Sequence, residues 1–157
     1  MLSQFEEYLT LANIYVWINF GLIPFWLMLI FIPNSRLTRI FVNSIILPIL
    51  LATAYIYVIY QTFLLDEPLF EILKVYLSLD NLYTIFSTET FLLVFWIHFL
   101  SLNLFLGSWV SSDAVKYNIT KKLVFLPLIL IYFSGPVGLV LYWLIRIFYA
   151  KKLALHD

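Results

Sequence analysis

Four long apolar segments constrain most strongly how this chain can fold. They cover about residues 11–32, 40–64, 89–110 and 123–149. A helix needs about 20 mostly apolar residues to cross a bilayer, and each segment is long enough. Only helices and closed barrels satisfy their backbone groups in lipid, and these segments lack the period-two alternation of barrel strands. The sequence therefore predicts an all-α integral membrane protein with four transmembrane helices.

The composition agrees with this class and excludes several others. Charged residues make up 11% of the chain, against about 25% in soluble domains. Nine basic and nine acidic residues leave no net charge, so we expect no nucleic-acid partner. The chain has no cysteine and only two histidines, and no zinc-binding spacing, so we expect neither a metal nor a cofactor. Without repeats or linkers, residues 1–157 are predicted to form a single transmembrane domain.

The connection between the second and third apolar segments has a different pattern. From Leu69 to Tyr76, apolar side chains recur at the i, i+3, i+4 and i+7 positions of an amphipathic helix, and polar side chains fall opposite them. The connection is too polar to cross a bilayer. We therefore predict an interfacial helix at about residues 68–79, and a lid over a cavity of the bundle is the alternative.

The basic residues of the short connections suggest an orientation. Connections 33–39 and 111–122 are rich in Lys and Arg, whereas connection 65–88 holds only Lys74. Cytoplasmic loops carry the excess of basic residues, so this pattern places both termini outside. Lys151 and Lys152 argue for the opposite side at the C-terminus.

One histidine lies in the middle of the third segment. His98 is nine residues from Glu89, the start of that segment, which corresponds to a depth of roughly 13 Å. An ionisable residue at this depth suggests function, because its insertion is costly. Neutral imidazole can donate, accept or carry a proton. Two interpretations stay open: acid–base chemistry on an apolar substrate, or a hydrogen bond to a neighbouring helix.

Other embedded side chains complete the predicted site. Antiparallel third and fourth helices would bring Glu89 near Arg146, so we expect a structural ion pair between them. Asp113 is expected near the membrane surface, in water. Asn19 and Asn43 would each need a partner on another helix. The residues expected to bind an apolar ligand are Phe95, Phe105, Trp109, Trp26 and Asn19.

Three stretches carry a resemblance to a known family. They are NFGLIPFWLMLIFIP at 19–33, FWIHFLSLNLFLGSWVSSDA at 95–114 and FSGPVGLVLYWLIR at 133–146. They resemble the abscisic-acid-deficiency-four-like family of small membrane proteins, whose plant members are needed to make neoxanthin. The family pattern has an aspartate where this chain has Asn103. An amide cannot exchange a proton as a carboxylate does, so this departure bears on the chemistry.

The resemblance implies an isomerase that acts on a carotenoid or another isoprenoid lipid. Conversion of an epoxide to an allene needs an acid and a base but no redox partner. On this resemblance the catalytic candidates are His98, Asp113 and Asn103. The alternative is a non-catalytic accessory or pigment-binding subunit of a larger membrane complex, and the sequence leaves open whether the protein is an enzyme.

The expected surroundings follow from the same reading. The partners are the lipid bilayer and an apolar isoprenoid or carotenoid ligand, with a homo-oligomer or a membrane complex as further options. The expected location is a bacterial inner membrane or a photosynthetic membrane. The enzyme hypothesis predicts a cavity that reaches His98, whereas the subunit hypothesis predicts a fully packed His98.

Overall fold

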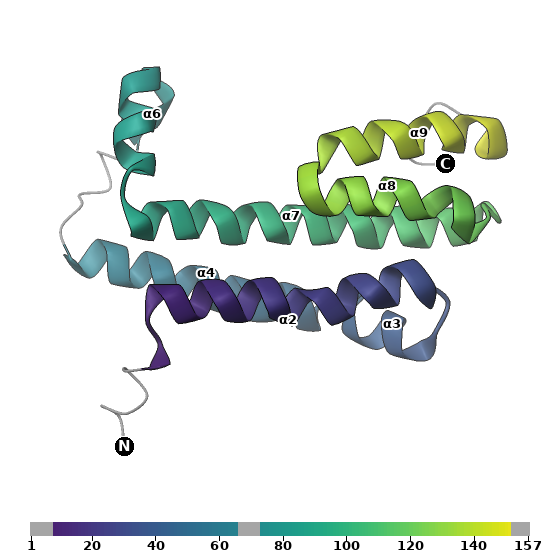
Figure 1. Ribbon diagram of the computed structural model, residues 1–157, viewed down its shortest axis with the longest axis horizontal. Helices are drawn as coiled ribbons and strands as arrows, with labels where there is room; N and C mark the ends of the chain where they lie inside the picture. Colours follow the sequence, from purple (N-terminus) through teal and green to yellow (C-terminus); the bar gives the residue numbers. More distant parts are fainter. Residues whose placement is uncertain (1–7, 66–72, 152–157) are drawn as a thin grey trace. The chain divides into compact units, whose positions relative to one another are not determined.

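The computed structural model describes residues 8–65 and 73–151, and every regular element in these ranges is helical (Figure 1). The predicted all-α class is therefore confirmed. The helices are α2 (Leu11–Phe31), α3 (Arg36–Phe41), α4 (Ile46–Leu65), the 3-10 turn η1 (Lys74–Tyr76), α6 (Leu79–Phe86), α7 (Glu89–Lys116), α8 (Lys121–Ser134) and α9 (Pro136–Ala150).

Within the described ranges, three stretches are helical, long and apolar enough to cross a membrane. They are α2, the stretch Arg36–Gln61 that includes α3 and most of α4, and α7. The helices α8 and α9 have 14 and 15 residues, which gives lengths of about 21 and 22 Å. Both are shorter than the hydrocarbon core of about 30 Å. The prediction of four spans is not confirmed, because residues 123–149 do not form one helix.

The chain turns at Gly135, between α8 and α9. Gly135 has φ 55°, in the region that residues with a side chain rarely adopt. Its N–H donates to the carbonyl of Ile131 and closes α8. Pro136 then starts α9 at the position where its missing N–H costs nothing. Figure 1 shows α8 and α9 side by side as a helical hairpin, in place of the single predicted fourth helix.

Two other predicted segments also differ in their bounds. The second apolar segment is interrupted at residues 42–45, so α4 begins at Ile46. The predicted interfacial helix at 68–79 lies partly outside the described residues. Its described part contains η1, and the separate helix α6 follows. Ser78 caps the start of α6, because its side chain accepts a hydrogen bond from the N–H of Asn81. Tyr76 and Leu79 are exposed, and an interfacial position stays a prediction.

The chain divides into two compact units. The first unit comprises residues 1–21 and 49–99, and the second comprises residues 22–48 and 100–157. Helices α2, α4 and α7 each contribute one part to the first unit and one part to the second. The prediction that the chain is a single domain stays untested.

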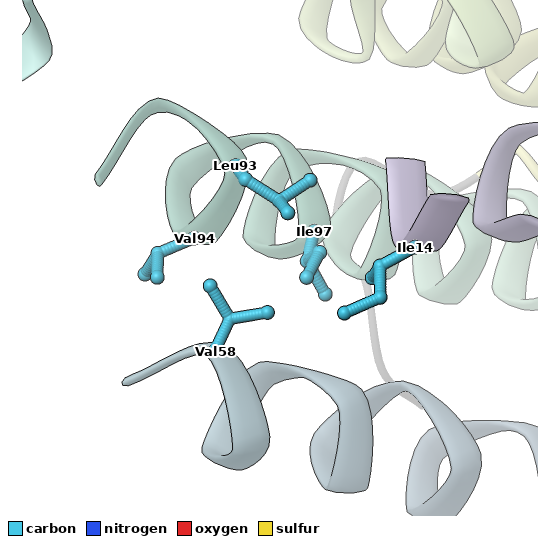
Figure 2. Close-up of a cluster of buried hydrophobic side chains, with 5 residues drawn as sticks. All are labelled: Ile14, Val58, Leu93, Val94 and Ile97. Carbon is cyan, nitrogen blue, oxygen red and sulfur yellow. The ribbon is translucent and has the colours of Figure 1, made fainter. Parts of the chain in front are cut away.

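The first unit has an apolar core. Side chains from the start of α2, the later part of α4 and the first part of α7 form one buried cluster (Figure 2). Aliphatic side chains fill this cluster and none of them brings a polar atom into it. Its members are Ile14, Val58, Leu93, Val94 and Ile97.

The second unit relies on small residues for close helix contacts. A Cβ on Gly138 of α9 would overlap the backbone of α8 at Ile131 and Pro127. A Cβ on Gly107 of α7 would lie 2.6 Å from the ring of Trp26 on α2. Glycine at these positions lets the helices approach as closely as membrane helix pairs often do.

Candidate functional site

The distribution of buried polar side chains differs between the two units. Among the described residues, every buried polar or charged side chain belongs to the second unit. Such groups are costly in an apolar interior unless they are paired. Because all of them belong to one unit, this unit is the place to look for a site. They are Thr38, Asn103, Ser111, Asp113 and Arg146.

The carboxylate of Asp113, near the end of α7, bonds to Tyr142 and Arg146, and these residues together with Tyr117 form what we call the polar cluster. Oδ2 of Asp113 accepts a hydrogen bond from the hydroxyl of Tyr142 at 2.6 Å and another from Nε of Arg146 at 2.7 Å. Asp113 is 8% exposed, Arg146 1% and Tyr142 0%. Charge-assisted bonds of this length are among the strongest in proteins. A positive and a negative charge therefore compensate each other inside the unit.

Helical spacing brings these side chains together. Tyr142 and Arg146 lie four residues apart on α9, and Asp113 and Tyr117 lie four residues apart on or next to α7. Residues with this spacing share one face of a helix. The guanidinium of Arg146 lies 4.9 Å from the centre of the Tyr117 ring and donates to its hydroxyl at 3.4 Å. The half-buried Trp109 packs edge-on against Tyr142, with ring centres 5.9 Å apart.

The structure corrects two predictions about charges. Arg146 forms its ion pair with Asp113, so the predicted structural pair with Glu89 is wrong. A single fourth helix would carry Arg146 toward the start of α7, but the turn at Gly135 reverses the chain and returns it toward the end of α7. Asp113 is consequently buried, and the prediction that it is solvated is also wrong.

Asn103 supports the hairpin turn. Its Nδ2 donates to the carbonyl of Tyr132 at 3.4 Å. In a continuous helix this carbonyl would accept from residue 136, which is a proline without an N–H. The amide of Asn103 therefore supplies the donor that Pro136 lacks. Its Oδ1 faces Gly135, where a Cβ would lie only 2.5 Å away.

The two embedded asparagines of the earlier segments find the interhelical partners that we expected. Asn43, in the break between α3 and α4, accepts from the hydroxyl of Ser108 at 2.7 Å and donates to that of Ser112 at 3.1 Å. In the first unit, Asn19 of α2 accepts from Nε1 of Trp96 on α7 at 3.1 Å. These expectations are confirmed.

The candidate residues on α7 lie in different surroundings. His98, in the first unit, is exposed and packs beside the ring of Tyr55, with ring centres 6.3 Å apart. Phe105 is 67% exposed. Trp109 and Asp113, further along the same helix, are covered by α9. A catalytic role of His98 stays a prediction.

The first unit has a pocket of about 500 Å³ between the starts of α2 and α7. Glu89 brings a carboxylate to this otherwise apolar site, and the volume is that of a typical small-ligand pocket. Trp96, one of the lining residues, donates to Asn19 through the bond described above. The lining residues are Leu11, Ala12, Tyr15, Glu89, Leu92, Leu93 and Trp96.

The remaining predicted ligand-binding aromatics pack against protein. Phe95 is partly exposed and stacks edge-on with Phe86, with ring centres 4.8 Å apart. Trp26 is buried in the second unit, edge-on to Tyr132, with ring centres 5.3 Å apart. Its Nε1 has no hydrogen-bond partner among the described residues. Their ligand-binding roles stay predictions.

Two aromatic residues of the polar cluster, Tyr117 and Tyr142, were not predicted from the sequence. A signal was present, because each lies four residues from a charged residue, Asp113 and Arg146 respectively. The sequence alone did not show that these two pairs meet, because their contact depends on the turn at Gly135.

A comparison with known families decides the relationship. The sequence model of the ABA4-like family, described as ABA DEFICIENT 4-like, matches residues 13–142. The chain belongs to the ABA4-like family. The ABA4-like match includes Asn103, Asp113 and Tyr142, and it ends four residues before Arg146. No curated protein and no solved structure shows significant similarity to the chain.

Proposed function

We propose that this member of the ABA4-like family is a membrane-embedded isomerase-like enzyme that acts on a carotenoid or another isoprenoid lipid. The observation that carries the proposal is the buried contact of 2.6 Å between the Tyr142 hydroxyl and the Asp113 carboxylate. This contact places a proton donor and a proton acceptor together in a chain with apolar, membrane-length helices. In the proposal, an apolar substrate reaches this pair from the bilayer.

The pair has the groups that an epoxide-to-allene isomerisation requires. The C–O bond of the epoxide breaks as an acid protonates the oxygen, which becomes a hydroxyl group. A base removes one proton from the neighbouring polyene carbon, and the electron pair of that C–H bond forms the new double bond. No oxidant or reductant is needed. In the proposal Tyr142 is the acid, Asp113 is the base, and Arg146 orients the carboxylate.

Access to the pair depends on Trp109. This half-buried ring covers Tyr142 from the side, and we propose that a substrate displaces it. The Glu89 pocket of the first unit is a second place where an isoprenoid could bind. We give His98 no catalytic step, since the Tyr142–Asp113 pair is the one that protein encloses.

One observation favours the accessory-subunit function as a second candidate. Leu102 and Phe105 are exposed on the part of α7 that belongs to the second unit. Large exposed apolar side chains suit contact with a pigment or with a second membrane protein. In this alternative the buried Asp113–Arg146 pair only fixes the fold.

The test is expression in a host that makes epoxy-carotenoids, followed by chromatography of the pigments. The proposal expects a new isomer with the wild type, and at least a tenfold loss with Tyr142→Phe or Asp113→Asn. Tyr149→Phe is the matched control, because Tyr149 lies on the same helix and is exposed. It should keep full conversion.

Two results would redirect the assignment. Full conversion by Tyr142→Phe together with loss in His98→Ala would move the chemistry to His98. Unchanged pigments with the wild type, together with a membrane protein that co-purifies with it and is lost in a Phe105→Ser variant, would favour the accessory subunit.

A further inference from the structure

Lys121, the first residue of α8, lies between two pockets of the second unit. One pocket has a volume of about 270 Å³ and the other about 320 Å³. Both are lined by Ile30 and Lys121. Because the pockets share these two residues, a molecule that occupies either one contacts the Lys121 side chain.

The ammonium group of Lys121 is held in place. Its Nζ donates to the carbonyl of Phe31, the last residue of α2, at 3.1 Å. Carbonyls at the end of a helix have no partner within that helix, so Lys121 satisfies one of them. An ammonium group has three donors, and two remain available for a ligand. A positioned cation of this kind is better prepared for binding than a freely rotating surface lysine.

The two pockets offer an apolar surface directly beside positive charge. Ile30, Phe31 and Phe125 line the larger one, together with Lys121 and Lys122. In the smaller one, the buried side chains of Leu29, Val124 and Leu128 form an apolar floor, and Asn34, Asn118 and Thr120 add polar groups. A water-soluble anion would gain little from contact with the aromatic side chains, and a neutral lipid would gain little from the two ammonium groups.

Charge is one-sided in this part of the protein. In the described part of the second unit, Asp113 is the single acidic residue, and Arg146 already compensates it. The unit therefore has a strong positive excess. Basic groups next to membrane helices attract anionic lipids. The basic residues described in this unit are Arg36, Arg39, Lys116, Lys121, Lys122, Arg146 and Lys151.

From these observations we infer that the second unit binds an anionic phospholipid, with its phosphate at Lys121 and Lys122 and one acyl chain against Phe31 and Phe125. The charge complementarity selects the headgroup, and the aromatic wall selects a molecule with a hydrocarbon chain. This inference is independent of the proposed enzyme activity.

The test is lipid binding to the purified full-length chain by native mass spectrometry, with phosphatidylglycerol and phosphatidylcholine as probes of equal chain length. We expect at least tenfold preference for phosphatidylglycerol. Each lysine is worth about a fivefold change in affinity. Lys121→Gln/Lys122→Gln should therefore weaken phosphatidylglycerol binding roughly 25-fold.

The control changes the same amount of charge elsewhere in the unit. Arg36→Gln/Arg39→Gln removes two exposed basic residues of α3 that line neither pocket, and should change binding less than about threefold. Lys122→Gln alone keeps the Lys121–Phe31 bond and should cost about fivefold. Phe125→Ala should weaken binding severalfold with no change in charge.

Three results would overturn the inference. The first is equal binding of the two lipids. The second is an equal loss in the two double variants, which would indicate unspecific surface charge. The third is unchanged binding in Phe125→Ala, which would leave no role for the acyl chain.

Discussion

The interiors of the two units are stabilised by different interactions. The first unit packs aliphatic side chains such as Val58 and Ile97 around an apolar core. The second unit contains all the buried polar side chains that the structure describes, and they include the Asp113–Arg146 ion pair. In a bilayer, lipid tails solvate an apolar side chain about as well as protein does. Apolar contacts can therefore be exchanged for lipid, but the buried ion pair cannot.

This difference indicates that the second unit restricts the arrangement of its helices more strongly than the first unit does. Apolar packing allows the helices of the first unit to shift with modest loss. A buried charge tolerates only the arrangement that brings its partner within bonding distance. We therefore expect substitutions in the second unit to cost more, and the following predictions test that ranking.

The largest effect should come from breaking the ion pair. Arg146→Leu leaves the Asp113 carboxylate buried without its counter-charge, and we expect a loss of about 3–5 kcal/mol of unfolding free energy. Titration with denaturing detergent, followed by circular dichroism, measures it. Asp113→Leu/Arg146→Leu removes both charges and should recover much of the loss. A double variant as unstable as the single one would show that the charge pair is not the cause.

A smaller loss should follow from adding one methyl group between α8 and α9. Gly138→Ala places a Cβ against the α8 backbone, and overpacking of this kind costs about 1–3 kcal/mol. The same unfolding titration reports it. Gly21→Ala is the matched control, because nothing lies within 4 Å of its new Cβ, and it should be neutral or stabilising by up to about 1 kcal/mol. Equal effects at both glycines would contradict the close contact.

The hairpin turn should respond to the loss of one donor. Asn103→Leu leaves the Tyr132 carbonyl without its donor, and membrane hydrogen bonds of this type are worth about 0.6–1.7 kcal/mol. Asn103→Asp can donate only when the carboxyl group is protonated, so its stability should approach that of the wild type as pH falls. If the variant lost the same stability at every pH, the Asn103–Tyr132 hydrogen bond would not be what stabilises the turn.

The smallest effect is expected in the first unit. Ile97→Val removes one methylene from the apolar core and should cost about 0.5–1.5 kcal/mol. Hydrogen exchange of the amides in α4 and α7 would locate any loosening. A cost above that of Arg146→Leu would reverse the ranking of the two units.

The sequence was most informative about long helices and least informative about chain direction. Apolar length alone predicted α2, α4 and α7, because a bilayer demands it. The Ser134–Gly138 stretch did not predict a turn, since membrane helices tolerate internal Gly and Pro when neighbours supply partners. Only the direction of α9 decides whether Arg146 meets Glu89 or Asp113. The polar cluster therefore could not be assembled before the turn was known.

The turn at Gly135 also affects the expected side of the membrane on which the end of α9 lies. Because α9 runs back beside α8, Lys151 comes to the same end of the hairpin as Lys121. We therefore expect Lys151, which opposed the charge rule in the predicted arrangement of four spans, to obey it together with the other basic loops. If the three apolar stretches each cross the membrane and the hairpin returns, the number of crossings is odd, and we expect Tyr8 and Lys151 to lie in different compartments. In this cysteine-free chain, single cysteines introduced near each end and probed with an impermeant reagent would read that out directly.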